Sequence, residues 1–143
     1  MEVTRREPQK LSESECLRLL RRAHVGRLAI SSGAVPVILA VDYSMTDAAV
    51  LVRTAESDRI KAATDRAVVA FEASGVEDDE NAWSVSIAGI AREASADELD
   101  PSAVDELPHW LAPYAERVVA ISIDRMTGHR VALELDVRDR PAG

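Results

Sequence analysis

The amino-acid sequence predicts a mainly β protein, an antiparallel barrel of the Greek-key type with helices at its periphery. Three observations support this fold class. Seven short segments rich in β-branched residues follow one another along the chain. Most of them are separated by tight turns, so consecutive strands are expected to pair as antiparallel hairpins. No alternation of strand and helix of the kind that builds a parallel sheet is present, which argues against a dinucleotide-binding α/β fold.

The first half of the chain contains two expected helices and three expected strands. A helix is expected at residues 11–22, because Ser12 and Glu15 form a capping box ahead of an apolar stripe. Strands are expected at residues 27–31, 35–43 and 48–53, joined by turns at residues 32–33 and 45–47. Three strands in this order form an antiparallel meander. A short helix is then expected from about residue 57 to residue 64.

The second half of the chain supplies the remaining strands. An almost continuously apolar strand is expected at residues 67–72, an acidic exposed loop at 74–81 and a long strand at 83–93. Gly89 within that strand indicates a bulge or a sharp bend. A helix is expected at residues 97–107, a connector at 108–113, a strand at 117–124, a turn at 126–129 and a last strand at 130–135. We expect a flexible arm at residues 1–10, one domain at 11–137 and a flexible tail at 138–143.

The composition excludes several classes of protein. The chain of 143 residues has a formal net charge of −8 and contains two Trp, two Tyr and one Phe. An acidic surface with so few aromatic rings argues against nucleic-acid partners and against anionic membrane surfaces. No apolar run reaches the roughly 20 residues of a membrane-spanning helix, and the N-terminus does not resemble a signal peptide. The single cysteine, Cys16, fits a reducing cytoplasm.

Motifs for metal-dependent or hydrolytic chemistry are missing. The three histidines are far apart, and no cysteine or histidine spacing typical of zinc is present, so no metal site is expected. The acidic residues 78–80 do not form a calcium-loop pattern and are expected to be solvated. No serine-nucleophile elbow and no glycine-rich nucleotide loop occurs. No side chain is identified as a catalytic acid or base.

One stretch, residues 50–63, has features of an anion site. Arg53 and Thr54 end an apolar strand, and Ser57 and Asp58 are both suited to cap the helix that follows. Free backbone N–H groups and the helix dipole favour an anion at such an end, and Arg59 adds a second guanidinium. The same pattern is also that of an ordinary strand end and helix cap, so both interpretations stay open on the residues alone.

The segments taken together resemble a known family. The carrying motifs are VGRLA at residues 25–29, AVDY at 40–43, VRTAE at 52–56, VAFE at 69–72, WSVSIAG at 83–89 and TGHR at 127–130. In this order and spacing they resemble the pyridoxamine 5′-phosphate oxidase-like, FMN-binding split-barrel proteins, in the branch of small members found in actinobacteria. The resemblance extends from about residue 11 to residue 131.

This resemblance implies a six-stranded split barrel, a homodimer, and a flavin at each end of the dimer interface. It implies a flavin-dependent oxidoreductase that acts on a small-molecule substrate, with FMN as cofactor and the deazaflavin F420 as the alternative. The residues implied for the cofactor are Arg53, Thr54, Ser57 and Arg59 at the phosphate, Val41, Asp42 and Tyr43 along the ring, and Trp83, Ser84 and Trp110 of the partner subunit covering the ring.

The chain departs from the family pattern in two places. At the phosphate corner, Ser57 stands where the pattern has glycine, Asp58 where it has a small hydroxyl residue and Arg59 where it has lysine, and along the ring Asp42 stands where it has asparagine. An ionised carboxylate cannot donate a hydrogen bond to a flavin carbonyl. A second hypothesis is therefore a non-catalytic dimeric binding or regulatory protein with a degenerate flavin site and no cofactor. The position of the Asp58 carboxylate discriminates between them, because it either caps the amides of residues 60 and 61 or faces solvent.

Overall fold

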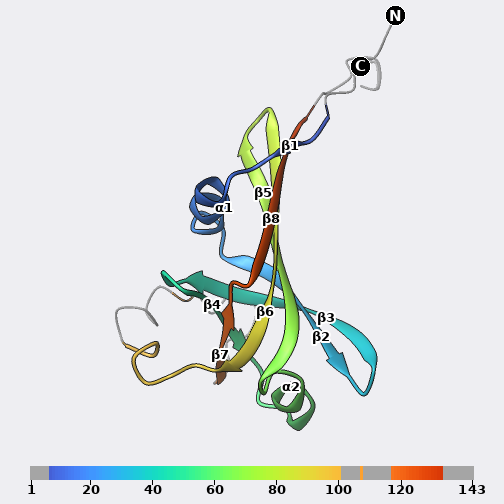
Figure 1. Ribbon diagram of the computed structural model, residues 1–143, viewed down its shortest axis with the longest axis vertical. Helices are drawn as coiled ribbons and strands as arrows, with labels where there is room; N and C mark the ends of the chain where they lie inside the picture. Colours follow the sequence, from blue (N-terminus) through green and yellow to red (C-terminus); the bar gives the residue numbers. More distant parts are fainter. Residues whose placement is uncertain (1–6, 101–106, 108–116, 134–143) are drawn as a thin grey trace, which may run out of the picture.

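The fold is mainly β, as the sequence predicts, with short helices at the periphery (Figure 1). The computed structural model of the protein describes residues 7–100, 107 and 117–133. Within these residues the elements in chain order are β1 (Gln9–Lys10), α1 (Glu13–Leu20), β2 (Val25–Ser32), β3 (Val35–Met45), β4 (Ala49–Thr54), α2 (Asp58–Ala63), β5 (Ala67–Asp78), β6 (Asn81–Glu93), β7 (Arg117–Ser122) and β8 (Arg125–Ala132).

Six of the strands close into an antiparallel barrel. The sheet order is β1-β8-β6-β5-β2-β3-β4-β7, and an additional pairing of β6 with β7 closes the ring through β6, β5, β2, β3, β4 and β7. Strand β6 belongs to two ladders on the same edge: residues 81–88 pair with β8, and residues 91–93 pair with β7. The sheet therefore divides along β6, with β8 and β1 leaving the barrel as an extension (Figure 1).

Gly89 lies where β6 changes partner. A Cβ atom at this position would come within 1.7 Å of the backbone carbonyl oxygen of Ser122, which ends β7. Only glycine permits this approach of two backbones. The bend predicted from Gly89 is thus explained by a neighbouring strand rather than by a bulge, because the ladder with β5 continues through it and shifts register only between Val76 and Asp78.

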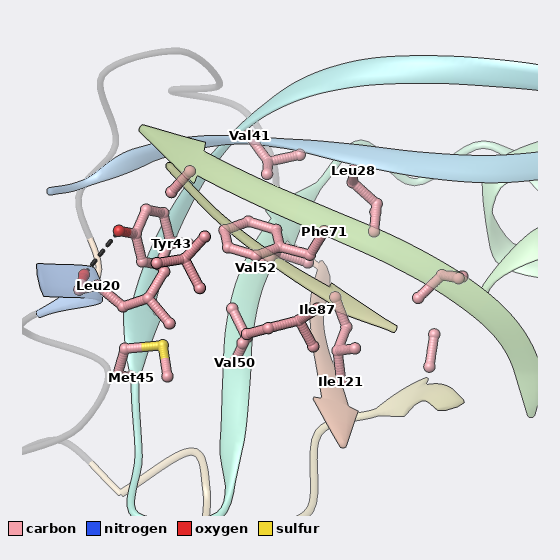
Figure 2. Close-up of a cluster of buried hydrophobic side chains, with 14 of the residues drawn as sticks. Leu20, Leu28, Val41, Tyr43, Met45, Val50, Val52, Phe71, Ile87 and Ile121 are labelled. Carbon is pink, nitrogen blue, oxygen red and sulfur yellow. Dashed lines mark hydrogen bonds between the residues drawn. The ribbon is translucent and has the colours of Figure 1, made fainter. Parts of the chain in front are cut away.

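The barrel interior is a single apolar core. The rings of Tyr43 and Phe71 pack edge to face with centroids 4.9 Å apart. The Tyr43 hydroxyl donates a hydrogen bond of 2.6 Å to the carbonyl of Leu20, which joins the end of α1 to β3 (Figure 2). Helix α1 begins as predicted, since the Ser12 hydroxyl accepts from the backbone N–H of Glu15. It seals one side of the core with Cys16, Leu19 and Leu20.

The structure has strands at two places where the sequence predicted a loop or a turn. The acidic loop expected at 74–81 is the continuation of β5 to Asp78, whose carboxylate accepts from the backbone N–H groups of Glu80 and Asn81 at 2.8 Å in a tight turn. Pairing with β6 over its whole length outweighs the low β-propensity of these residues. The turn expected at 126–129 lies inside β8, where Gly128 gives room to the Cys16 thiol of α1.

The ends of the expected domain are placed only in part. Gln9–Lys10, at the end of the expected flexible arm, forms β1 and pairs with His129 and Arg130 of β8. Of the helix expected at 97–107, residues 96–99 form turns, and 101–106 lie outside the described residues together with 108–116 and the expected tail. No helix among the described residues is long and apolar enough to cross a membrane.

Candidate functional site

Strand β4 is buried on both of its faces. All six of its residues are buried, and alternation along the strand divides them between two environments. Val50 and Val52 belong to the barrel core, whereas Ala49 and Leu51 belong to a second, outer apolar cluster with Ala94, Leu107, Val118 and Ala120. Because Arg53 and Thr54 are consecutive, the first lies on the outer face and the second on the inner face. The two residues predicted to share one phosphate are therefore on opposite sides of the sheet.

Arg53 has a buried guanidinium on the outer face. The residue is 7% exposed, and its Nη2 donates to the carbonyl of Leu107 at 3.4 Å. Its Nε has no hydrogen-bond partner among the described residues. Burial lowers the pKa of Arg53 from its usual value, and the negative charge of Asp42 opposes that shift. A buried cation with a donor to spare is suited to bind an anion.

Asp42 lies beside Arg53 at the end of the β3–β4 ladder. The pairs Tyr43 with Val52 and Ser44 with Leu51 place Asp42 opposite Arg53, one step beyond the last pair. Because Val41 and Tyr43 point into the core, the side chain of Asp42 is on the outer face. It is completely buried. Asp42, predicted to lie along the flavin ring, is thus next to Arg53, predicted to bind the flavin phosphate.

The inner end of β4 holds a second polar group. Thr54 is 3% exposed, and its Oγ1 has no partner among the described residues. Opposite it in the ladder lies Arg117, whose Nη1 donates at 2.5 Å to the hydroxyl of Thr64, which in turn donates at 2.7 Å to the carbonyl of Ile60. Arg117 therefore ties β7 to α2. Sequence reasoning missed this contact, because nothing local to residue 117 or 64 indicates it.

Helix α2 is capped by Ser57 and not by Asp58. The Ser57 hydroxyl accepts from the backbone N–H of Ile60 at 3.0 Å, and its carbonyl accepts from that of Lys61 at 2.9 Å. Asp58 is exposed in the first turn. The Asp58 carboxylate therefore does not cap the amides of residues 60 and 61, which are bonded to Ser57. Arg59 donates from Nε to the Ser32 hydroxyl at 2.7 Å and so ties α2 to the β2–β3 hairpin.

The residues predicted along the flavin ring are distributed differently from the expectation. Val41 and Tyr43 have their side chains in the core, which leaves Asp42 on the outer face. Trp83 was predicted to cover a ring bound to the partner subunit, but it is 5% exposed and packs in its own core against Gly75. Ser84 is half-buried on β6, and Trp110 lies outside the described residues.

An apolar strip runs across the outer face of four strands. The ladders align Ile38 with Ala29, Ala29 with Ala70, and Ala70 with Ala88. The neighbouring row pairs Val68 with Ile90. Ile38 is 71% exposed and Val68 is 72% exposed. Outward positions alternate along β3, so the outer face leads from Ile38 through Ala40, which lies beside the Arg27–Glu72 ion pair, to Asp42. The outer apolar strip, defined by these apolar residues, therefore adjoins the Asp42–Arg53 pair.

Comparison with known proteins identifies a family and several relatives that match most of the chain. The chain matches the family model described as pyridoxamine 5′-phosphate oxidase over residues 12–130. An uncharacterised protein from Mycobacterium tuberculosis is 30% identical over 139 residues, covering 90% of this chain and 89% of the relative.

Two solved structures have the same fold. The FAD-binding protein from Mycobacterium smegmatis is 28% identical, with a TM-score of 0.72, and the match covers 87% of this chain and 99% of that one. A candidate pyridoxamine 5′-phosphate oxidase from Corynebacterium glutamicum is 26% identical, with a TM-score of 0.73 and coverage of 92% and 99%. The antiparallel barrel with few short helices is thus the split barrel of these proteins.

Proposed function

Because this chain belongs to the pyridoxamine 5′-phosphate oxidase-like family, we propose that it is a flavin-dependent oxidoreductase that binds its cofactor at the interface of a homodimer. The observation that carries the proposal is the buried Arg53 guanidinium on the outer face of β4, with a donor nitrogen that no described residue uses. Buried polar groups are nearly always hydrogen-bonded, so an unused donor next to a surface strip indicates a ligand.

Among the described residues, the position that fits a flavin phosphate is the guanidinium of Arg53. Arg53 would hold the phosphate through charge-assisted hydrogen bonds, and Arg59 would contribute from the exposed side of α2. When bound, the flavin ring supplies hydride or electron transfer, and the protein supplies orientation and electrostatics. The exposed outer face of β3 would contact the ring. No described side chain has the placement of an acid or base for a small-molecule substrate.

The outer apolar strip supports the homodimer. Residues such as Ile38 and Val68 expose most of their surface, in rows aligned across four strands. Aligned apolar side chains on an open sheet face are typical of an interface rather than of a solvated surface. Because the outer face of β3 leads from this strip to Asp42, a second subunit seated on it would bring its own residues to the Arg53 corner. Val68→Glu is expected to yield a monomer in light scattering, whereas Val76→Glu on the same strand leaves a dimer.

The choice of cofactor lies between three related molecules. The family resemblance implies FMN or F420, whereas the M. smegmatis relative of known structure binds FAD. All three carry a phosphate that Arg53 can bind. The test is titration of the purified protein with each cofactor, followed by absorbance and by the melting temperature. We expect stabilisation by at least one of them, reduced at least about tenfold in affinity by Arg53→Gln.

A non-catalytic dimeric binding protein is the second candidate, and the buried Asp42 favours it. A carboxylate beside Arg53 competes with the phosphate for the guanidinium. This candidate predicts that no cofactor stabilises the wild-type protein, even at concentrations that saturate a flavoprotein. The absence of any spectral or thermal response to FMN, FAD and F420 would therefore contradict the oxidoreductase proposal.

A further inference from the structure

Resting on the proposed function, we propose that Asp42 is a specificity-determining residue that makes the Arg53 corner select a singly charged phosphodiester over a dianionic phosphate monoester. The corner would thus prefer a flavin whose phosphate is part of a diester or pyrophosphate, as in FAD and F420, to FMN. The buried charge of Asp42 would then determine which class of flavin binds. Asp42, which departs from the family pattern, would be a functional residue of the site.

The geometry places Asp42 and Arg53 in one buried environment. They follow the last pair of the β3–β4 ladder on neighbouring strands, and both side chains are on the outer face. Asp42 is 0% exposed and Arg53 is 7% exposed. The Leu107 carbonyl that accepts from Arg53 adds further negative charge density at the guanidinium. A ligand phosphate must therefore approach a cation that is already compensated.

Among the described residues, a further buried charge at this end of β4 is Arg117, which lies on the inner face opposite Thr54 and donates to Thr64. Glu56, Asp58 and Arg59 are exposed, and there water and salt reduce their influence on a ligand. On the outer face of the sheet, Asp42 and Arg53 are buried, and in such a medium of low effective dielectric charges a few ångströms apart interact several-fold more strongly than in water. The charge that a phosphate meets at Arg53 is therefore set by Asp42 and only weakly by Asp58.

The two kinds of phosphate differ in the charge that they present. A phosphate monoester has a second pKa of about 6 and carries close to two negative charges at neutral pH. Each phosphate of a diester or pyrophosphate linkage carries one. The repulsion from Asp42 is proportional to the charge on the phosphate that Arg53 binds, so it penalises the monoester of FMN about twice as much as the diester.

The experiment measures the dissociation constants of FMN and FAD for the wild-type protein and for Asp42→Asn by absorbance titration. Riboflavin, which lacks a phosphate, reports the contribution of the ring alone. We expect the wild type to prefer FAD, and Asp42→Asn to shift the ratio of the two constants toward FMN by about tenfold or more. The matched control is Asp58→Asn, which removes the same charge at an exposed position and is expected to shift the ratio less than about twofold.

A second measurement keeps the wild-type sequence. Between pH 7.5 and pH 5.5 the phosphate of FMN gains a proton, whereas the pyrophosphate of FAD does not. The affinity for FMN relative to FAD is therefore expected to rise as the pH falls, and FAD serves as the reference for pH effects that are common to both flavins. This measurement replaces the first if neither Asp42→Asn nor Asp42→Ser folds.

Each outcome decides one of the two proposals. If flavins bind but the ratio changes neither in Asp42→Asn nor with pH, the role of Asp42 is wrong and the flavoprotein proposal stands. An equal shift in Asp58→Asn also overturns it, because a general charge effect would then suffice. If no variant binds any flavin at either pH, both proposals fall. If the wild type binds FAD and only Asp42→Asn binds FMN, both proposals are supported. If the wild type binds no flavin and Asp42→Asn binds both, the selectivity proposal is wrong and the wild type is the non-catalytic alternative.

Discussion

The two faces of β4 are equally buried but differ in what buries them. On the inner face, Val50 and Val52 pack among apolar side chains of the barrel core. On the outer face, Leu51 and Arg53 lie under Ala94 and Leu107, with the carboxylate of Asp42 alongside. The inner face gains its stability from apolar area removed from water. The outer face includes a charge pair whose desolvation offsets most of its attraction, so stability alone does not explain it.

This difference separates residues that specify the fold from residues that specify a ligand. A core position is satisfied by any side chain of suitable volume. A buried aspartate and arginine opposite one another place a defined electrostatic field at one point of the sheet. Substitution of an inner-face residue is therefore expected to lower the stability of the fold. Substitution of Arg53 on the outer face is expected to weaken ligand binding.

The largest effect is expected from breaking the inner face at Phe71. The ring is 1% exposed and fills the space that Gly26 leaves open. Phe71→Ala is expected to lower the free energy of unfolding by about 3–5 kcal/mol in denaturant titrations, while leaving the ratio of FMN to FAD affinity unchanged. Val76→Ala on the same strand, 63% exposed, is the control and should cost less than about 0.5 kcal/mol. Equal costs would contradict the assignment of Phe71 to the core.

The next effect concerns the charge pair of the outer face. Arg53→Met alone leaves the Asp42 carboxylate buried without its neighbouring cation and is expected to cost about 3 kcal/mol of unfolding free energy. The double variant Asp42→Leu with Arg53→Met is expected to recover most of that stability and to bind flavin more weakly than the wild type. A double-mutant cycle measures the coupling. Strictly additive costs would show that the two side chains do not interact.

A smaller effect is expected at Tyr43, which belongs to the inner face but carries a polar group. Tyr43→Phe removes the hydrogen bond to the Leu20 carbonyl and should cost about 1 kcal/mol. Burial raises the pKa of Tyr43 in the folded protein well above its usual value of about 10. The unfolded chain therefore loses this proton first, and the contribution of Tyr43 to stability declines as the pH rises above about 10. The Phe variant should lack that component of the alkaline decline.

Local patterns in the sequence predicted most of the fold. Ser12 with Glu15 marked the start of α1, and the turn at Gly33 marked the β2–β3 hairpin, where Gly33 and Ala34 adopt positive φ angles of 55° and 67°. The errors arose where pairing with a distant strand decided the conformation. Residues up to Asp78 form a strand because β6 pairs with them, although their composition is that of a loop.

The site was predicted less well, for a related reason. Sequence proximity suggested that Arg53 and Thr54 act together, although alternation along a strand places consecutive side chains on opposite faces. The neighbour of Arg53 is Asp42, which is brought there by the β3–β4 ladder. The family resemblance assigns Trp83 to the cover of the ring, and its packing against Gly75 within the core is visible only in the structure. Register and packing are properties of the whole sheet, which a single segment does not encode.

The smallest expected effect concerns the turn that follows Ala94, a residue of the outer apolar cluster. After Ala94, the Glu98 carboxylate accepts from Arg92 Nη1 at 2.6 Å and from the backbone N–H of Ser95 at 2.9 Å. Chiefly because of the Arg92 hydrogen bond, the pKa of Glu98 is lowered from 4.5 to about 2 in the folded protein.

A carboxylate with a lowered folded-state pKa stabilises the protein above its unfolded-state pKa and loses that contribution as the pH falls. The window for Glu98 therefore extends from about pH 4.5 down to about pH 2. Glu98→Gln should cost less than about 1 kcal/mol at pH 7 and should flatten the acid decline of the free energy of unfolding. Asp97→Asn, an exposed change in the same turn, is the control. An acid profile of Glu98→Gln that matches the wild type would show that the bonds from Arg92 and Ser95 to Glu98 do not contribute to stability.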